Sequence, residues 1–371
     1  MKGASRCKPG KRDMKKDIKS IVENWGQGSI LGTRLVAWAE YMALPMFPDI
    51  KEKLDGVINT YVDSATDKKT INKIKRDVLL SRLKYDISFS QYFVHGYEHL
   101  TEEGRREFVG EREKERYVRL ANEKTGTHSI FRDKYQTYES FKPYYHRSVI
   151  RILPDNREEF LRFAKDHARF ILKYSDEALG KGVQIIDQAD TAESMEAFFN
   201  RLVSDTHNYI VEELIVQSPE MMTLHPSSVN TVRFATYLKG DDVLHLFSFL
   251  RMGSGNGVID NATAGGFAAA IDMETGIVTS PACREDMTRV LFHPDTGVQI
   301  IGMQIPRWQE LLSLVDQLAK VVPEQKYVGW DLALTEQGWI MVEGNDDAMI
   351  TAIQMCERKG LREVFDNAFK N

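Results

Sequence analysis

Residues 328–347 read VGWDLALTEQGWIMVEGNDD, and this stretch says more about function than any other part of the chain. Its first half alternates as a β-strand does, Gln337-Gly338 supplies a turn, and the remainder reads as a return strand. In such a hairpin Asp331 and Glu343 lie side by side, with Asn345 two positions further along the same face. Two carboxylates and an amide are the oxygen ligands that Mg²⁺ or Mn²⁺ prefers beside substrate phosphates. Two interpretations stay open here: a metal site or a solvated acidic rim.

The composition is that of an ordinary globular protein. With 371 residues the chain exceeds the length at which a single core usually stops growing, so we expect two or three domains. The net charge of −5 gives no general attraction to nucleic acid. Three widely separated cysteines lack the spacing of paired metal ligands and fit a reduced, cytoplasmic protein. Arg34 and Glu40 interrupt the most apolar stretch, residues 30–47, so we expect no transmembrane segment.

The N-terminal third divides into a basic tail and a helical region. Residues 1–16 carry seven Lys or Arg side chains against Asp13 alone, and no apolar signal-peptide core follows. The tail is either frayed or a weak contact for anionic lipid or an acidic partner. Residues 17–127 repeat apolar positions every three or four residues, which predicts a helical domain. Within it, the run 102–119 alternates Glu and Arg and predicts one exposed helix.

After residue 128 the pattern changes to short strands. Residues 170–174 form an apolar strand that contains Lys173, and a buried ammonium needs a partner. That partner is a nucleotide phosphate, a local acid such as Asp187, or solvent reached by snorkelling. Gly180-Lys181-Gly182 then leads into the next strand, and such a turn leaves backbone N–H groups available to phosphates. It is also the turn of any plain hairpin.

The strand at residues 208–216 carries paired acids, Glu212 and Glu213, in its middle. A strand that runs into an interdomain connection offers backbone groups to the edge of a purine, and Glu220 just beyond it is the candidate for the ribose hydroxyls. The alternative is that the paired acids mark an exposed edge strand protected from aggregation.

Two loops rich in small residues follow. Arg233 stands at the start of a strand, and residues 251–257 and 261–266 bracket a segment without bulky side chains. Guanidinium groups beside glycine-rich backbone suit chemistry in which negative charge builds up on a phosphoryl or acyl-phosphate group. A flexible surface loop is the other interpretation.

From Phe131 to the C-terminus these residues together resemble the ATP-grasp superfamily. The matching positions are Lys134, Lys173, the Gly180-Lys181-Gly182 flap, the Glu212-Glu213-Leu214-Ile215 hinge, Arg233, Asn261, Asp331 and Glu343-Gly344-Asn345. Residues 230–233, 265–266, 293–297 and 329–331 are most similar to the sugar-transfer-associated branch, found with polysaccharide biosynthesis genes. The resemblance implies an α+β fold in which two α+β subdomains, residues 128–215 with the flap and 216–371 with the metal site, clasp ATP behind a helical N-terminal domain.

The resemblance also implies a role for each nucleotide-binding residue. Lys134 and Lys173 would contact the α- and β-phosphates, and a flap at residues 178–183 would close over them. The backbone of Glu213 and Leu214 in the hinge would hold adenine between the two subdomains.

The chemical roles would fall to the second subdomain. Arg233 would face the γ-phosphate, and Asp331, Glu343 and Asn345 would hold two Mg²⁺ ions, with Glu343 bridging them and with Mn²⁺ able to substitute. Where the D-alanyl-D-alanine ligases carry an arginine two positions before the first metal acid, this chain has Gly329. Arg233 or Arg251 would replace that guanidinium, and the sequence leaves the choice open.

A second departure follows the asparagine, where those ligases carry a proline-glycine pair and this chain has Asp346-Asp347. The acceptor pocket is therefore expected to differ. We expect an ATP- and Mg²⁺-dependent ligase that joins a carboxylate, on a sugar acid or an amino acid, to an amine through an acyl phosphate. The alternatives are a phosphotransferase on the same fold and a non-catalytic nucleotide-binding scaffold in polysaccharide biosynthesis. The substrates would be small molecules, and the sequence does not fix the oligomeric state.

Overall fold

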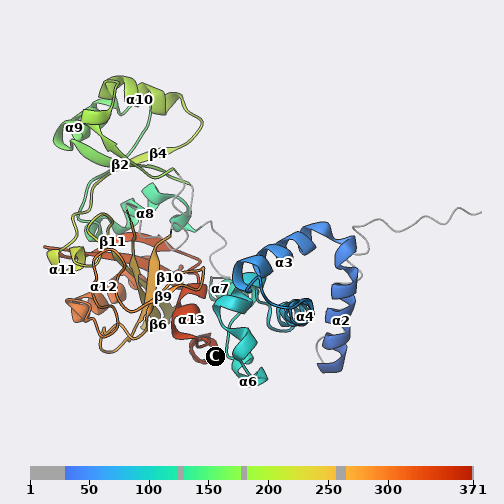
Figure 1. Ribbon diagram of the computed structural model, residues 1–371. Coiled ribbons are helices and arrows are strands. Elements are labelled where there is room, and N and C mark those ends of the chain that lie inside the picture. The colour runs from blue at the N-terminus through green and yellow to red at the C-terminus, as the bar shows by residue number, and fades with distance from the viewer. Residues whose placement is uncertain (1–29, 123–128, 177–181, 256–264, 370–371) are drawn as a thin grey trace, which may run out of the picture. The chain divides into compact units, whose positions relative to one another are not determined.

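The computed structural model describes residues 30–122, 129–176, 182–255 and 265–369 (Figure 1). Contacts divide the chain into two compact units, Met1–Glu113 and Lys114–Asn371. The basic tail and the predicted boundary at residue 127 lie outside the described residues. Among the described residues, none of the helices has both the length and the apolar character needed to cross a membrane.

Every secondary-structure element of the first unit within residues 30–113 is a helix. Its helices are α2 (Ile30–Ala43), η1 (Leu44–Met46), α3 (Pro48–Tyr61), α4 (Lys68–Tyr85), α5 (Phe89–Val94), η2 (Tyr97–His99) and α6 (Glu102–Arg106). The side chain of Asp67 accepts hydrogen bonds from the first turn of α4, and Ser88 and Gln91 form a capping box at α5. Leu54, Val78 and Leu79 are fully buried in its core. The predicted helical N-terminal region is confirmed.

The prediction of a single exposed helix over residues 102–119 is wrong. Helix α6 ends at Arg106, and α7 (Glu111–Asn122) begins after a break at residues 107–110. The break includes Gly110, where an added Cβ would lie 2.5 Å from the carbonyl oxygen of Asp86. Lys114 on α7 is buried, and its Nζ lies 2.6 Å from the Asp347 carboxylate. Lys114 therefore belongs to the interior of the second unit, although its run of alternating charges predicted an exposed position.

A four-stranded antiparallel sheet comes first in the second unit. Its order is β1-β4-β2-β3, and its strands are β1 (Val149–Arg151), β2 (Arg169–Tyr174), β3 (Gln184–Asp187) and β4 (Tyr209–Glu213). Helices α9 (Arg157–Asp166) and α10 (Met195–Ser204) cover one face (Figure 1). They bury Phe160, Phe163 and Phe198 against Phe170 and Leu172 of β2. The interior position of β4 contradicts the alternative that its paired acids mark an edge strand.

A seven-stranded antiparallel sheet forms the larger part. Its order is β11-β10-β5-β6-β7-β8-β9, and its strands are β5 (Thr231–Lys239), β6 (Asp242–Met252), β7 (Phe267–Ile271), β8 (Ala282–Cys283), β9 (Arg289–Val290), β10 (Tyr327–Thr335) and β11 (Gly338–Asn345). The β10–β11 hairpin is confirmed, but Glu336 and Gln337 form its turn, so the predicted turn is one residue too late. Arg233 lies inside β5 and not ahead of it.

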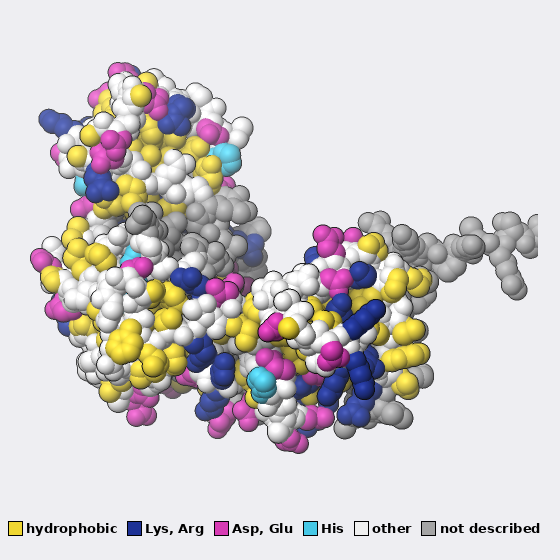
Figure 2. Space-filling model, in the orientation of Figure 1, with side chains coloured by type: hydrophobic (Ala, Val, Ile, Leu, Met, Phe, Trp, Pro, Cys, Tyr) yellow, Lys and Arg dark blue, Asp and Glu magenta, His cyan; other side chains and the backbone are white. Residues whose placement is uncertain are grey.

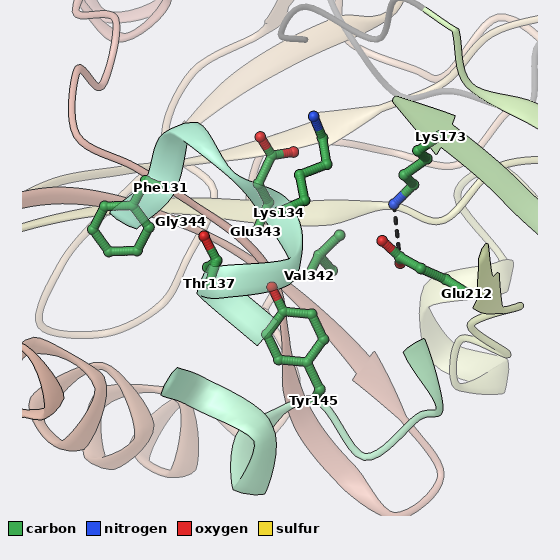
Figure 3. A pocket seen from close by; sticks show the side chains of 9 residues that line it. All are labelled: Phe131, Lys134, Thr137, Tyr145, Lys173, Glu212, Val342, Glu343 and Gly344. Atoms are coloured by element: carbon green, nitrogen blue, oxygen red, sulfur yellow. Dashed lines mark ion pairs between the residues drawn. The ribbon is translucent and has the colours of Figure 1, made fainter. Parts of the chain in front are cut away.

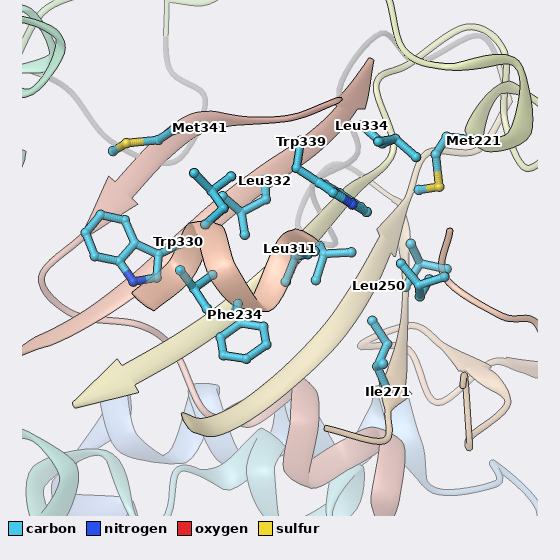
Figure 4. Close-up of a cluster of buried hydrophobic side chains, with 14 of the residues drawn as sticks. Met221, Phe234, Leu250, Ile271, Leu311, Trp330, Leu332, Leu334, Trp339 and Met341 are labelled. Atoms are coloured by element: carbon cyan, nitrogen blue, oxygen red, sulfur yellow. The ribbon is translucent and has the colours of Figure 1, made fainter. Parts of the chain in front are cut away.

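Helices cover both faces of this sheet. One face packs against α12 (Trp308–Val321) and α8 (Lys134–Phe141), and Figure 4 shows its core around Phe234, Leu311 and Trp330. Helices α13 (Thr351–Glu357) and α14 (Arg362–Phe369) both pack against β6, and α13 also contacts β7 and β8. Phe369 of α14 stacks on Tyr237 of β5, with ring centroids 4.3 Å apart. The shorter elements are η3 (Ile130–Arg132), η4 (Lys142–Tyr144), η5 (Gln188–Asp190) and α11 (Pro219–Met222). The predicted α+β class is confirmed.

Candidate nucleotide and metal site

A polar pocket lies where the two sheets of the second unit meet. Figure 3 shows the residues that line it: Phe131, Lys134, Thr137, Tyr145, Lys173, Glu212, Val342, Glu343 and Gly344. Four of these carry charge, and each comes from a different element: α8, β2, β4 and β11. The pocket thus joins residues far apart in the sequence, three of which had been predicted to bind nucleotide and one to bind metal.

Lys134 is placed by the cap of its helix. The Asp133 carboxylate accepts hydrogen bonds from the N–H groups of Tyr135 and Gln136 and from the Ser175 hydroxyl. The N–H of Lys134 donates to the Ser175 carbonyl at 2.9 Å, which ties the helix to the end of β2. Burial lowers the pKa of the Lys134 ammonium, although the nearby Glu343 carboxylate opposes the shift. The ammonium runs beside Glu343 in the pocket (Figure 3).

Lys173 points at an acid that the sequence had not singled out as its partner. Its Nζ lies 3.0 Å from Oε2 of Glu212 on the neighbouring strand β4 (Figure 3). Asp187, the predicted local acid, instead pairs with Arg169 at 3.2 Å. Burial favours the neutral form of Glu212, but Lys173 and Arg147 outweigh it and hold the pKa of this carboxyl below its usual range. Lys173 and Glu212 thus form an ion pair at the wall of the pocket.

Replacing Lys173 with Met should weaken nucleotide binding by roughly one to two orders of magnitude, because a charge-assisted phosphate contact contributes about 1.5–3 kcal/mol. Calorimetric titration of the purified chain with a non-hydrolysable ATP analogue measures the loss. Arg169→Met is the matched control, since it removes a cation from the same strand but breaks only the exposed pair with Asp187. Equal affinity in the two variants would assign Lys173 a structural role.

Glu343 and Asp331 are paired across the β10–β11 hairpin, as predicted, but a β-bulge is needed to pair them. Leu332 pairs with Met341, whereas Asp331 pairs with Glu343, so Val342 is an extra residue. In a regular hairpin with the same two-residue turn and no bulge, Asp331 would lie opposite Val342. Gly329 pairs with Asn345 beyond the bulge, so the amide follows the carboxylate along the strand.

Arg147 holds that bulge and was missed by sequence reasoning. Its guanidinium donates to the carbonyls of Met341 at 2.7 Å and Val342 at 3.0 Å, and to Glu212 at 3.2 Å. The same guanidinium lies 4.3 Å from the centre of the Tyr145 ring. It thereby links the strand that carries Glu212 to the bulge ahead of Glu343. An isolated arginine before a short strand gives no pattern by which the sequence could have revealed it.

Two arginines converge on Asp331. Arg233 contacts this carboxylate through Nε and through Nη2 at 2.7 Å, and Arg251 donates through Nη1 at 2.7 Å. Burial works to raise the pKa of Asp331, but the two guanidinium groups hold it at about 2. Arg233 and Arg251, the two candidates that the sequence left open, therefore both form ion pairs with Asp331.

Glu343 lies in the opposite electrostatic situation. Burial and the facing Asp331 raise its pKa, and Lys173 and Lys134 offset only part of that effect. A carboxylate that is short of positive charge, beside a second carboxylate and an amide, is a donor set that fits a divalent cation. Among the described residues, no three His, Cys, Asp or Glu side chains are grouped as around a metal ion, and the predicted set has two carboxylates and an amide. Asp331 is already engaged by Arg233 and Arg251. Its use as a metal ligand thus requires an exchange of partners.

The departures at positions 329 and 346–347 have physical explanations. An added Cβ at Gly329 would lie 2.4 Å from the Cβ of Ala348, so no side chain fits there. Asp347 forms the ion pair with buried Lys114, and Asp346 lies 3.9 Å from Arg132. The guanidinium groups beside Asp331 come from Arg233 on β5 and Arg251 on β6.

Glu213, Leu214 and Glu220, which were also predicted to bind nucleotide, do not line this pocket. The N–H of Glu213 donates to the Ser148 carbonyl at 3.0 Å, so this N–H group is already hydrogen-bonded within the protein. Leu214 is the first residue after β4. Glu220 is exposed on α11 and does not line the pocket of Figure 3.

Of the predicted flap and loop residues, Gly180, Lys181 and Asn261 lie outside the described residues. Gly182 has φ of +71°, and a Cβ there would lie 2.1 Å from the Tyr174 ring, so only glycine is compatible with the position.

Comparison with known proteins supplies further information. Residues 104–370 match a family model described as sugar-transfer associated ATP-grasp. Among solved structures, an ADP complex of N5-carboxyaminoimidazole ribonucleotide synthetase is similar, with a TM-score of 0.37 and 8% identity over 60% of this chain and 46% of that one. The ATP-grasp ligase PsnB has a TM-score of 0.39 and 13% identity, over 67% of this chain and 66% of its own.

The D-alanine–D-alanine ligase of Helicobacter pylori gives a TM-score of 0.37 and 12% identity, over 65% of this chain and 59% of its own. The chain thus spans between about half and two thirds of the length of these three proteins. No curated protein matches the sequence significantly.

Proposed function

Because the chain belongs to the sugar-transfer-associated ATP-grasp family, we propose that it is an ATP- and Mg²⁺-dependent ligase that joins a carboxylate to an amine. ATP-grasp enzymes generally use ATP with Mg²⁺. The acid would be a sugar acid or an amino acid, which fits the association of the family with sugar transfer. The reaction would release ADP and phosphate and form an amide.

One observation carries this proposal. Lys134 and Lys173 enter one pocket with Glu343, and the carboxylate paired with Glu343 across the hairpin binds two arginines. The lysines suit the phosphates of ATP, and the arginines suit a substrate carboxylate or the phosphoryl group that it receives. A non-catalytic nucleotide-binding scaffold would gain nothing from two partly buried guanidinium groups beside the acidic end of the pocket. The scaffold alternative is disfavoured for this reason.

In the proposed reaction an oxygen of the substrate carboxylate attacks the γ-phosphorus of ATP, and the bond to the β,γ-bridging oxygen breaks to release ADP. The amine then attacks the carbonyl carbon of the acyl phosphate, loses a proton, and expels phosphate. Lys134 and Lys173 hold the nucleotide, while Arg233 and Arg251 orient the acid and balance charge on the transferred group. Glu343, Asn345 and Asp331 would hold Mg²⁺, which supplies charge neutralisation on the phosphates.

The fate of oxygen tests the ligase proposal. With ¹⁸O-labelled acid as co-substrate, inorganic phosphate should carry label only when a competent amine is also present, because the oxygen between carbon and phosphorus leaves with phosphate. Candidate sugar acids and amino acids with simple amines are screened first by ADP release. Mass spectrometry of the phosphate then reads the label. Unlabelled phosphate together with amide formation would contradict the acyl-phosphate route.

A phosphotransferase acting on a hydroxyl group is the second candidate, and the replacement of an arginine by Gly329 favours it. The packing of Ala348 against that glycine means that the acceptor side of the pocket is not built as in the D-alanyl-D-alanine ligases. A kinase would leave the phosphoryl group on a stable organic product and release no phosphate. Such a product in the same labelling experiment would replace the ligase proposal with this one.

A further inference from the structure

The outward face of α2 is hydrophobic. Leu35, Trp38, Met42 and, just beyond the helix, Met46 are 54–60% exposed. They recur at intervals of three and four residues, so they follow one side of the helix and its continuation. Single exposed apolar side chains are normal, but a continuous row of four, including a tryptophan, marks an interaction surface.

A strongly basic helix packs against α2. Helix α4 has seven Lys or Arg residues and one acid among its 18 residues. Lys68, Lys69, Lys73 and Arg76 are exposed. The Arg76 guanidinium lies 5.9 Å from the centre of the Tyr41 ring on α2, so the basic face adjoins the helix that carries the row. Figure 2 shows Lys and Arg side chains (dark blue) gathered beside the hydrophobic ones (yellow) in this unit.

The sequence ahead of α2 has the same sign of charge. Residues 1–16 contain seven Lys or Arg side chains and one Asp, although the chain as a whole carries a net charge of −5. Residues 30–113 carry 13 Lys or Arg and 14 Asp or Glu, so the positive charge near the row is local to α4 and to the segment ahead of α2.

We infer that the row on α2 and the exposed basic face of α4 form a docking surface for a lipid bilayer with anionic headgroups. Tryptophan and methionine side chains enter the boundary between headgroups and acyl chains, while lysines beside them bind the negatively charged surface. A polyanion without an apolar phase, such as nucleic acid, would leave Trp38 and Met42 in water. This docking surface lies in the unit Met1–Glu113, whereas the pocket residues belong to the other unit, so the inference is independent of the proposed reaction.

Co-sedimentation of the full chain with vesicles tests the inference. The chain should bind vesicles of equimolar phosphatidylcholine and phosphatidylglycerol at least roughly tenfold more tightly than vesicles of phosphatidylcholine alone, because the lysines need an anionic partner. Binding should weaken as salt is raised. Brominated acyl chains should quench part of the tryptophan fluorescence, and Trp38→Phe should remove part of that quenching. Trp308, Trp330 and Trp339 are buried and provide the unquenched background.

Two sets of variants locate the surface. Trp38→Ser with Met42→Ser should lower the partition coefficient roughly tenfold or more, as should neutralising Lys68, Lys69 and Lys73 to Gln. Because all five side chains are exposed, thermal melting should be unchanged. The matched controls are Leu120→Ser, an exposed leucine on α7, and Arg162→Gln with Lys165→Gln on α9, which should bind as the wild type does.

Three results would overturn the inference. The first is equal binding to neutral and anionic vesicles. The second is binding that is lost when residues 2–16 are deleted but is untouched by the Trp38 and Met42 changes, since the tail alone would then carry it. The third is a wild-type chain that is oligomeric by light scattering and becomes monomeric in the Trp38 and Met42 variant, because the row would then be covered by a second copy.

Discussion

Glu343→Gln should abolish turnover and leave the folded chain at least as resistant to heat as the wild type. The loss of activity should be about a thousandfold or more, because a carboxylate that holds a phosphate-bound cation contributes several kcal/mol to the transition state. Stability should not fall, since burial and the facing Asp331 raise the pKa of this carboxyl and its charged form opposes folding at neutral pH. ADP release and calorimetric melting without nucleotide measure the two effects.

Asp331→Asn is the paired variant, and its effect on stability should have the opposite sign. Arg233 and Arg251 would lose their shared carboxylate in a buried site, which costs about 3–5 kcal/mol of unfolding free energy. The pH dependence follows from the lowered pKa of about 2. The ionised Asp331 stabilises the fold fully above its ordinary pKa of 3.8, and this stabilisation is lost as the pH falls toward 2. The difference in melting temperature between the wild type and Asp331→Asn should therefore become smaller as the pH is lowered from 3.8 toward 2.

These two variants also test the metal assignment without a known acid substrate. The affinity of the wild type for a non-hydrolysable ATP analogue should rise with Mg²⁺, and Glu343→Gln should remove most of that rise. If Glu343→Gln retains both the Mg²⁺ effect and turnover, the carboxylate does not bind the metal. If it destabilises the fold as much as Asp331→Asn does, the electrostatic contrast between the two acids is wrong.

Arg147→Ala should give the second large effect, on stability and catalysis together. Removing the guanidinium takes one of its two cationic partners from the buried Glu212 and removes a hydrogen-bond donor from the Met341 and Val342 carbonyls. Breaking a buried pair of this kind costs about 3–5 kcal/mol. Turnover of the folded variant should fall about a hundredfold, because Glu343 follows the bulge that Arg147 holds and small misplacements in a site are costly. Urea unfolding and steady-state assays below the melting temperature measure the two losses.

Conservative and surface variants make the Arg147 prediction specific. Arg147→Lys should recover part of the stability but little of the turnover, because an ammonium cannot bind two carbonyls and a carboxylate in fixed directions. Arg157→Ala removes an exposed arginine paired with Glu196 and should change the unfolding free energy by less than about 1 kcal/mol. Normal turnover and Mg²⁺ response in folded Arg147→Ala would show that Arg147 does not position Glu343.

The sequence predicted the parts of this protein that depend on local pattern. Scattered motifs were sufficient for the family resemblance, which the match over residues 104–370 confirms. The α+β class, the helical N-terminal region and the pairing of Asp331 with Glu343 are also confirmed. The class and the helical region follow from periodicity and side-chain types at short spacing, whereas the pairing of Asp331 with Glu343 also depends on the bulge at Val342, which the sequence did not predict.

What the sequence could not predict depends on partners brought together by the fold. Asp187 was the local acid considered for Lys173, but the neighbouring strand supplies Glu212 instead. Lys114 stood in a run of alternating charge, and only the fold shows it buried against Asp347. Arg147 belongs to no motif, and three of its four acceptors, Glu212 and the carbonyls of Met341 and Val342, lie on strands that are distant in the sequence.

The bulge at Val342 has a consequence for how this hairpin tolerates change over generations. Loss of one residue between the turn and Glu343 would remove the bulge and restore a regular ladder, in which the glutamate would still lie opposite Asp331. Gain of one residue in the same segment would instead place the glutamate opposite Trp330 and turn it to the other face of the sheet. Insertions in this short segment should therefore be purged more strictly than deletions, and a relative that carries one extra residue there should be inactive.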